Sequence, residues 1–177
     1  MKQILLVYAS QTGFTQRYAQ WIGRELDALA IPQRDCTQEM VEGADLVIFG
    51  GSVRGSIITG QTKLERMLRR AGGRQVIWFA VGIRPDTPRT LELVRKNNFS
   101  KEETPELFYF RGGMDPEQLK PGDKTLITCY RAMMKRRRDL DPEDREIITL
   151  LRTPCDYTDP ERIAPLVRRA RELTASE

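Results

Sequence analysis

The chain has 177 residues, 40% hydrophobic and 31% charged, a balance that suits one globular domain with a sizeable core. It contains no histidine, which excludes histidine-based acid–base catalysis, histidine-dependent nucleophiles and most transition-metal sites. Lysine and arginine (29) outnumber aspartate and glutamate (25), and the net charge of +4 favours acidic partners or an anionic membrane surface.

Several further classes of site are not expected. Aromatic residues make up only 7% of the chain and form no base-stacking platform, so we expect no nucleic-acid partner. Cys36, Cys129 and Cys155 are widely spaced and form no CxxC pair, which favours three reduced thiols over a disulfide framework or a metal site. Any chemistry is therefore expected to come from a cofactor, with no catalytic side chain.

The N-terminal run Met1–Val7 resembles a short strand and lacks the longer apolar region and cleavage site of a signal peptide. No apolar run approaches the ~18 residues that span a bilayer. We therefore expect a cytoplasmic protein.

Strand and helix patterns alternate along the chain. Apolar runs predict strands at Lys2–Tyr8, Ile31–Cys36, Ala44–Gly50, Gln75–Val81 and Glu106–Phe110. Apolar residues at helical spacing predict helices at Phe14–Leu29, Gln61–Ala71, Thr87–Asn98 and Pro160–Thr174. This alternation, with right-handed crossovers, predicts an α/β fold with a five-stranded, doubly wound parallel sheet.

The segment from Gly112 to Tyr157, here called the insertion, interrupts the alternation before the last helix. It contains a predicted helix at Lys124–Arg138 and a second short helix that ends at about Arg152. The first helix has an apolar face of Leu126, Ile127, Tyr130, Met133 and Met134. Its other side carries Lys124, Arg131, Lys135, Arg136 and Arg138. We expect a single domain over residues 1–177, with the insertion at about 112–157.

The first strand runs into a short polar loop, Ser10–Thr15, that opens the first helix. Free backbone N–H groups and the helix macrodipole make such a helix N-terminus an anion site, and Gly13 allows close backbone approach. The loop therefore predicts a bound phosphate. The alternative is an ordinary strand-to-helix turn capped by a hydroxyl side chain.

The same stretch resembles the flavodoxin signature. The matching positions are Leu6, Val7, Tyr8, Ser10, Gly13, Thr15, Ala19 and Ile22. The resemblance implies a flavodoxin-like sheet of strand order 2-1-3-4-5 with bound FMN. Its phosphate would be wrapped by Ser10, Gln11, Thr12, Gly13, Phe14 and Thr15. The sequence contains neither a Walker lysine nor a GxGxxG motif, so it lacks the usual motifs for binding nucleoside triphosphates and dinucleotides.

The resemblance also implies two loops around the isoalloxazine ring, one after the third strand and one after the fourth. The first is Gly51–Ser56, with Gly51, Ser52, Val53, Arg54 and Gly55 as cofactor-binding residues. The second is Gly82–Asp86, with Gly82, Ile83 and Arg84 in that role. The alternative is that both loops are flexible connections without a ligand.

Both loops depart from the pattern of many electron-carrier flavodoxins, whose ring-binding loops contain aromatic residues. Here the loops contain none, and the arginines Arg54 and Arg84 occupy them. A cation near the ring would favour the anionic reduced flavin and raise its potential. The alternative is two solvated surface arginines.

The loop sequence and the insertion together resemble the bacterial menaquinone-dependent protoporphyrinogen oxidase group. This resemblance implies six-electron oxidation of protoporphyrinogen IX through FMN, with electrons passed to a membrane quinone. Lys124–Arg138 would then contact the inner membrane face or a partner, unless this helix simply packs on the core. The alternatives are a non-catalytic electron carrier that docks on a redox-partner protein, and a binding module that has lost FMN.

Overall fold

The computed structural model describes residues 2–175, and its centre is a parallel β-sheet. The five parallel strands are β1 (Ile4–Ala9), β2 (Ala30–Pro32), β3 (Leu46–Arg54), β5 (Gln75–Gly82) and β6 (Glu106–Arg111). They lie in the order β2-β1-β3-β5-β6, which confirms the predicted order 2-1-3-4-5 because β4 (Ile57–Ile58) only pairs with the side of β3. In register, Leu6 of β1 faces Ala30 of β2 and Ile48 of β3.

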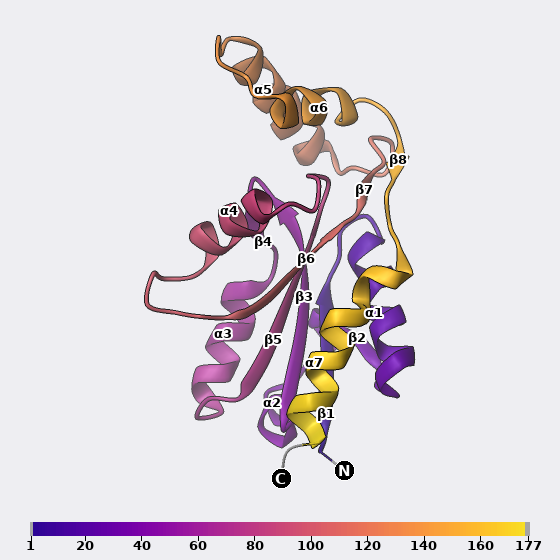
Figure 1. The fold of residues 1–177 in the computed structure, drawn as a ribbon, viewed down its shortest axis with the longest axis vertical. Helices are drawn as coiled ribbons and strands as arrows, with labels where there is room; N and C mark the ends of the chain where they lie inside the picture. The colour runs from indigo at the N-terminus through magenta and orange to yellow at the C-terminus, as the bar shows by residue number, and fades with distance from the viewer. Residues whose placement is uncertain (1, 176–177) are drawn as a thin grey trace.

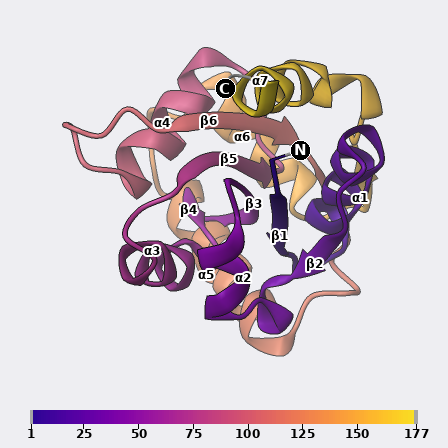
Figure 2. The ribbon, with the colours of Figure 1, turned by 90° about the horizontal axis from the view of Figure 1, so that it is seen from below.

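Helices cover both faces of the sheet (Figures 1 and 2). On one face lie α1 (Phe14–Leu26), the short 3-10 helix η2 (Pro160–Ile163) and α7 (Ala164–Ala175). On the other lie α2 (Gln38–Gly43), α3 (Gln61–Arg70) and α4 (Pro88–Asn98). Because each crossover returns to the starting edge of the sheet, every strand ends at the same edge, where ligands bind in such folds.

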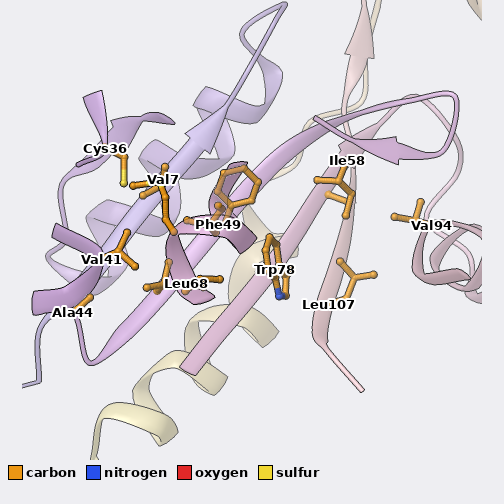
Figure 3. Close-up of a cluster of buried hydrophobic side chains, with 14 of the residues drawn as sticks. Val7, Cys36, Val41, Ala44, Phe49, Ile58, Leu68, Trp78, Val94 and Leu107 are labelled. Atoms are coloured by element: carbon orange, nitrogen blue, oxygen red, sulfur yellow. The ribbon is translucent and has the colours of Figure 1, made fainter. Parts of the chain in front are cut away.

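Two hydrophobic cores result, one on each face of the sheet. The core under α2, α3 and α4 contains Phe49 and Trp78, whose rings meet edge to face with centroids 5.5 Å apart (Figure 3). The core under α1 and α7 contains Tyr18 and Phe79, both fully buried. Strands β3 and β5 are nearly continuously apolar because both of their faces are covered.

Several predicted boundaries were wrong. The first helix ends at Leu26 because Asp27 takes a left-handed conformation (φ 49°) that lets the chain turn into β2. The second strand spans only Ala30–Pro32, since the chain beyond it forms the 3-10 helix η1 (Gln33–Asp35). Helix α2 was not predicted. Its N-cap is Thr37, whose hydroxyl accepts a hydrogen bond from the backbone N–H of Met40 at 3.3 Å.

The insertion projects from the edge of the sheet where the strands end (Figure 1). Its two ends pair as the short antiparallel strands β7 (Gly113–Met114) and β8 (Cys155–Asp156), which the sequence did not indicate. Between them lie α5 (Pro121–Lys135) and α6 (Pro142–Leu150). Both helices begin with proline at the first turn, where its missing N–H costs nothing.

Two predictions from the sequence concerned the cysteines and membrane-spanning segments. Cys36, Cys129 and Cys155 are all free thiols. Within residues 2–175, no helix combines the length and the apolar content needed to cross a membrane.

Candidate functional site

A cavity of about 360 Å³ opens at the edge where the strands end, and the three loops predicted from the sequence converge on it. Its size is at the lower end of the range for small-molecule sites. The loops form its floor and sides, while residues of α5 and α6 form the opposite wall. Residues of all three loops line this one cavity, and the wall added by the insertion was not foreseen from the sequence.

The first loop has the features of an anion site. Gly13 is the N-cap of α1 with φ 88°, a left-handed conformation that suits glycine, and its side chain position is open space. The Ser10 hydroxyl accepts a hydrogen bond from the Gly13 N–H at 3.1 Å. Thr15 is 1% exposed, and its Oγ1 has no hydrogen-bond partner among the described residues. The cavity is lined here by Gln11, Thr12, Phe14 and Thr15.

The second loop is shorter than predicted, because β3 continues to Arg54 and returns antiparallel as β4. Gly55 and Ser56 make the turn, with φ of 55° and 72°. Gly51 is therefore a sheet residue and not a loop residue. It is buried, it does not line the cavity, and any side chain there would meet the Thr59 carbonyl and Ile58. The cavity is lined here by Ser52, Val53, Arg54, Gly55 and Ser56.

The third loop follows β5, and Gly82, Ile83 and Arg84 line the cavity as predicted. Side chains from β6 hold its backbone. The Tyr109 hydroxyl donates to the Arg84 carbonyl at 3.1 Å, and Arg111 Nε donates to the Ile83 carbonyl at 3.3 Å. Tyr109 is 4% exposed, and this burial raises its pKa, so its hydroxyl keeps its proton. The third loop is therefore held by hydrogen bonds from the neutral Tyr109 hydroxyl and the cationic Arg111 guanidinium.

Each of the two loop arginines is paired with a carboxylate of the insertion. Arg54 forms an ion pair with Asp123 in the first turn of α5, and Asp123 is 8% exposed. Arg84 Nη2 lies 3.1 Å from Asp144 Oδ1 in the first turn of α6. Neither arginine is thus a simple solvated cation.

The sequence model of the flavodoxin domain matches residues 5–141, most of the chain. The chain belongs to the flavodoxin domain family. Members of this family typically bind FMN, so the chain is a flavodoxin-like FMN-binding redox protein.

Solved flavodoxin structures also resemble this chain. A flavodoxin from the domain Archaea is 16% identical, covers 83% of this chain and 99% of its own, and gives a TM-score of 0.42. Oxidised flavodoxin 2 from Bacillus cereus is 20% identical, with 62% and 84% covered and a TM-score of 0.41. A WrbA-like flavodoxin from Agrobacterium tumefaciens is 13% identical, with 96% and 99% covered and a TM-score of 0.42. No curated protein matches the sequence of this chain.

The first loop of this flavodoxin domain fits a phosphate. A buried hydroxyl without a hydrogen-bond partner costs free energy. A phosphate oxygen beside Thr15 Oγ1 would supply the missing partner. The N-terminus of α1 lacks a capping side chain in the described structure, so its N–H groups remain open to an anion. The first loop thus combines open backbone donors with a buried hydroxyl that a phosphate group could engage.

Some lining residues were missed by sequence reasoning. Gly112, Gly113 and Met114 follow β6 and line the cavity, because β6 ends at the same edge as β3 and β5. The strand pattern could have indicated these residues, because the fifth parallel strand must end at the same edge of the sheet as the others. The residues of α5 and α6 could not be found in this way, because helical periodicity does not say what an apolar face covers.

Proposed function

We propose that this flavodoxin-type chain uses FMN to pass electrons from a reduced small molecule to an apolar acceptor of the quinone class. The supporting observation is the wall that the insertion adds to the cavity. Its apolar members are Leu119, Leu126, Ile127, Tyr130, Ile147 and Leu151. An apolar wall around the cofactor site favours apolar small molecules because it excludes water from the contact. A carrier that docks on another protein needs no such enclosure.

The finer proposal is a protoporphyrinogen-oxidase-like activity, which rests on the loop sequence and the insertion. Oxidation of protoporphyrinogen IX to protoporphyrin IX removes six electrons and six protons, which three quinones take up to become three quinols. FMN would supply reversible electron uptake. The residues of the chain would bind it, enclose it, and set the charge around it through Arg54 and Arg84.

A peripheral membrane contact extends this proposal, since membrane quinones lie in the bilayer. Four consecutive exposed basic residues lie at the end of α5 and directly after it: Lys135, Arg136, Arg137 and Arg138. Next to them Met133 is 57% exposed. Basic residues near an anionic bilayer contribute about 1 kcal/mol each. The following Asp139 and Asp141 offset part of this attraction.

A second candidate function, a non-catalytic electron carrier, is favoured by a different observation. Leu126 and Met133 on α5 are 51% and 57% exposed. With the basic residues around them, they form a surface that suits an acidic partner protein. Under this alternative the insertion is a docking surface and not a substrate wall.

The first test is the absorbance spectrum of the purified protein after incubation with FMN, with the flavin identified after its release. We expect an oxidised flavin spectrum. A protein that stays colourless and takes up no FMN would refute both candidate functions.

The second test separates the two candidates. The photoreduced holoprotein is mixed anaerobically with a water-soluble menaquinone analogue, and protoporphyrinogen turnover is measured in parallel. The enzyme predicts fast reoxidation by the quinone and formation of protoporphyrin. Slow reoxidation by quinone, together with fast transfer to a protein acceptor, would favour the carrier.

A further inference from the structure

We propose that the insertion completes the cofactor site, with Tyr130 of α5 as the aromatic residue that covers the outer face of the isoalloxazine ring. This inference rests on the proposed binding of FMN in the cavity. The second and third loops contain no aromatic residue that could stack on the ring, so the insertion would supply it.

One stripe of α5 faces the cavity. Asp123, Leu126, Ile127 and Tyr130 all line it, and their spacing of three, four and seven residues places them on one side of the helix. Tyr130 and Ile127 are only partly exposed. Leu126, Ile127 and Tyr130, three of the five residues of the apolar face predicted from the sequence, thus line the cavity.

Ion pairs hold this wall against the loops and against β6 at three separate points. Arg54 of the second loop pairs with Asp123, two turns before Tyr130 on the same stripe. Arg84 of the third loop pairs with Asp144 of α6, and both side chains are largely buried (22% and 15% exposed). Arg111, at the end of β6, adds a third link to Glu146 of α6. Asp123 thus ties α5 to the end of β3, while Asp144 and Glu146 tie α6 to the third loop and to β6.

Three aromatic side chains line the cavity, and two of them are held by the body of the fold. Tyr109 is a buried β6 residue whose hydroxyl is bonded to the Arg84 carbonyl. Phe14 packs against the backbone of Gly113, where an added Cβ would lie 2.5 Å from its ring, and the Arg17 guanidinium sits 5.6 Å from its centroid. Tyr130 is the third, and it stands on the insertion wall, opposite the floor of the cavity. It is therefore placed to meet the exposed face of a bound ring.

A tyrosine ring against the flavin strengthens binding by stacking and quenches flavin fluorescence. We expect Tyr130→Leu to raise the Kd for FMN about two- to twelvefold, the range given by one aromatic pair. The bound flavin should also become more fluorescent and more accessible to iodide. Tyr130→Phe keeps the ring and should retain affinity and quenching.

The experiment uses the full-length chain and titrates each variant with FMN, following flavin fluorescence and iodide quenching. Met133→Ala is the control on the same helix, because Met133 is 57% exposed and does not line the cavity. Leu126→Ala is a second variant in the same stripe that leaves Tyr130 in place. Thermal unfolding of each cofactor-free variant confirms that it is folded.

Weaker binding and stronger fluorescence in Tyr130→Leu, with recovery in Tyr130→Phe, would support the inference. Wild-type affinity and quenching in Tyr130→Leu would overturn it while FMN binding itself stands. An effect of Leu126→Ala as large as that of Tyr130→Leu on quenching would also overturn it, since the wall would then act without the aromatic ring. If the unmodified chain takes up no FMN, the proposed function fails first.

Discussion

Arg54, the last residue of β3, forms an ion pair with Asp123, a residue of the insertion 69 positions later in the chain. Asp123 is 8% exposed and lines the cofactor cavity together with Arg54. A loop arginine expected to act as a free cation is therefore balanced by a carboxylate that only the insertion supplies. The net charge at this edge of the cavity therefore includes a contribution from the insertion.

The first prediction concerns the redox potential. Asp123→Asn leaves the Arg54 charge unbalanced and should raise the flavin midpoint potential, because a cation favours the anionic reduced form. Arg54→Met leaves the carboxylate and should lower it. One unit charge in partly buried surroundings is worth about 1–2 kcal/mol, or about 40–90 mV for a one-electron step. Redox titration of both variants and of the double variant measures these shifts, and the double variant should lie between them.

A charge far from the site serves as the control for this titration. Arg70 is exposed at the end of α3, away from the edge where the strands end, and Arg70→Met should leave the potential unchanged. Shifts of the same sign in Asp123→Asn and Arg54→Met would contradict the electrostatic account.

The second prediction concerns Thr15, whose buried hydroxyl lacks a partner in the described structure. Hydrogen bonds to charged groups contribute about 1.5–3 kcal/mol, so Thr15→Val should raise the Kd for FMN roughly tenfold to a hundredfold. The cofactor-free variant should be as stable as the parent or more so, because an unsatisfied polar atom is removed. Thr90→Val is the control: Thr90 is equally buried, but in α4 away from the cavity. Unchanged FMN affinity in Thr15→Val would contradict the phosphate assignment.

The third prediction concerns packing at Gly50 in β3. A Cβ at this position would overlap the ring of Phe79, which is fully buried. Gly50→Ala should therefore cost about 1–3 kcal/mol in the free energy of unfolding, measured by urea denaturation. Gly43→Ala is the control, because its nearest new contact is 3.8 Å away and Gly43 ends helix α2. A stability loss in Gly43→Ala equal to that in Gly50→Ala would contradict the packing argument.

The fourth prediction concerns the pH dependence of stability. Burial raises the pKa of the Asp86 carboxyl above its ordinary value, although Arg162, 3.6 Å away, opposes the rise. The ionised carboxylate is therefore less favourable in the folded chain than in the unfolded one, and it lowers stability at neutral pH. Asp86→Asn should raise the Tm at pH 7. This gain should shrink as pH falls through the folded pKa and vanish below about pH 4, where both states are protonated. A gain that grows toward acid pH would reverse the assigned sign.

Local pattern in the sequence was sufficient for the sheet and for most of the cofactor loops. The apolar runs around Val7, Phe49 and Trp78 have the length and the near-continuous apolar character of strands buried on both faces. Once those strands are parallel, the residues that follow them must meet at one edge. The error at Gly51 arose because a glycine next to a serine resembles a turn in sequence, whereas here it allows Thr59 and Ile58 to pack against β3.

The sequence by itself indicated the fold and the polar Ser10–Thr15 loop, because hydrophobic periodicity and the residue types of a strand-to-helix turn are local features of the chain. Only the tertiary structure decided what Arg54 and Arg84 face and what the apolar side of α5 covers. Those contacts join residues about 60 to 70 positions apart, and the pairing of one charge with another over that separation depends on how the insertion folds back on the loops.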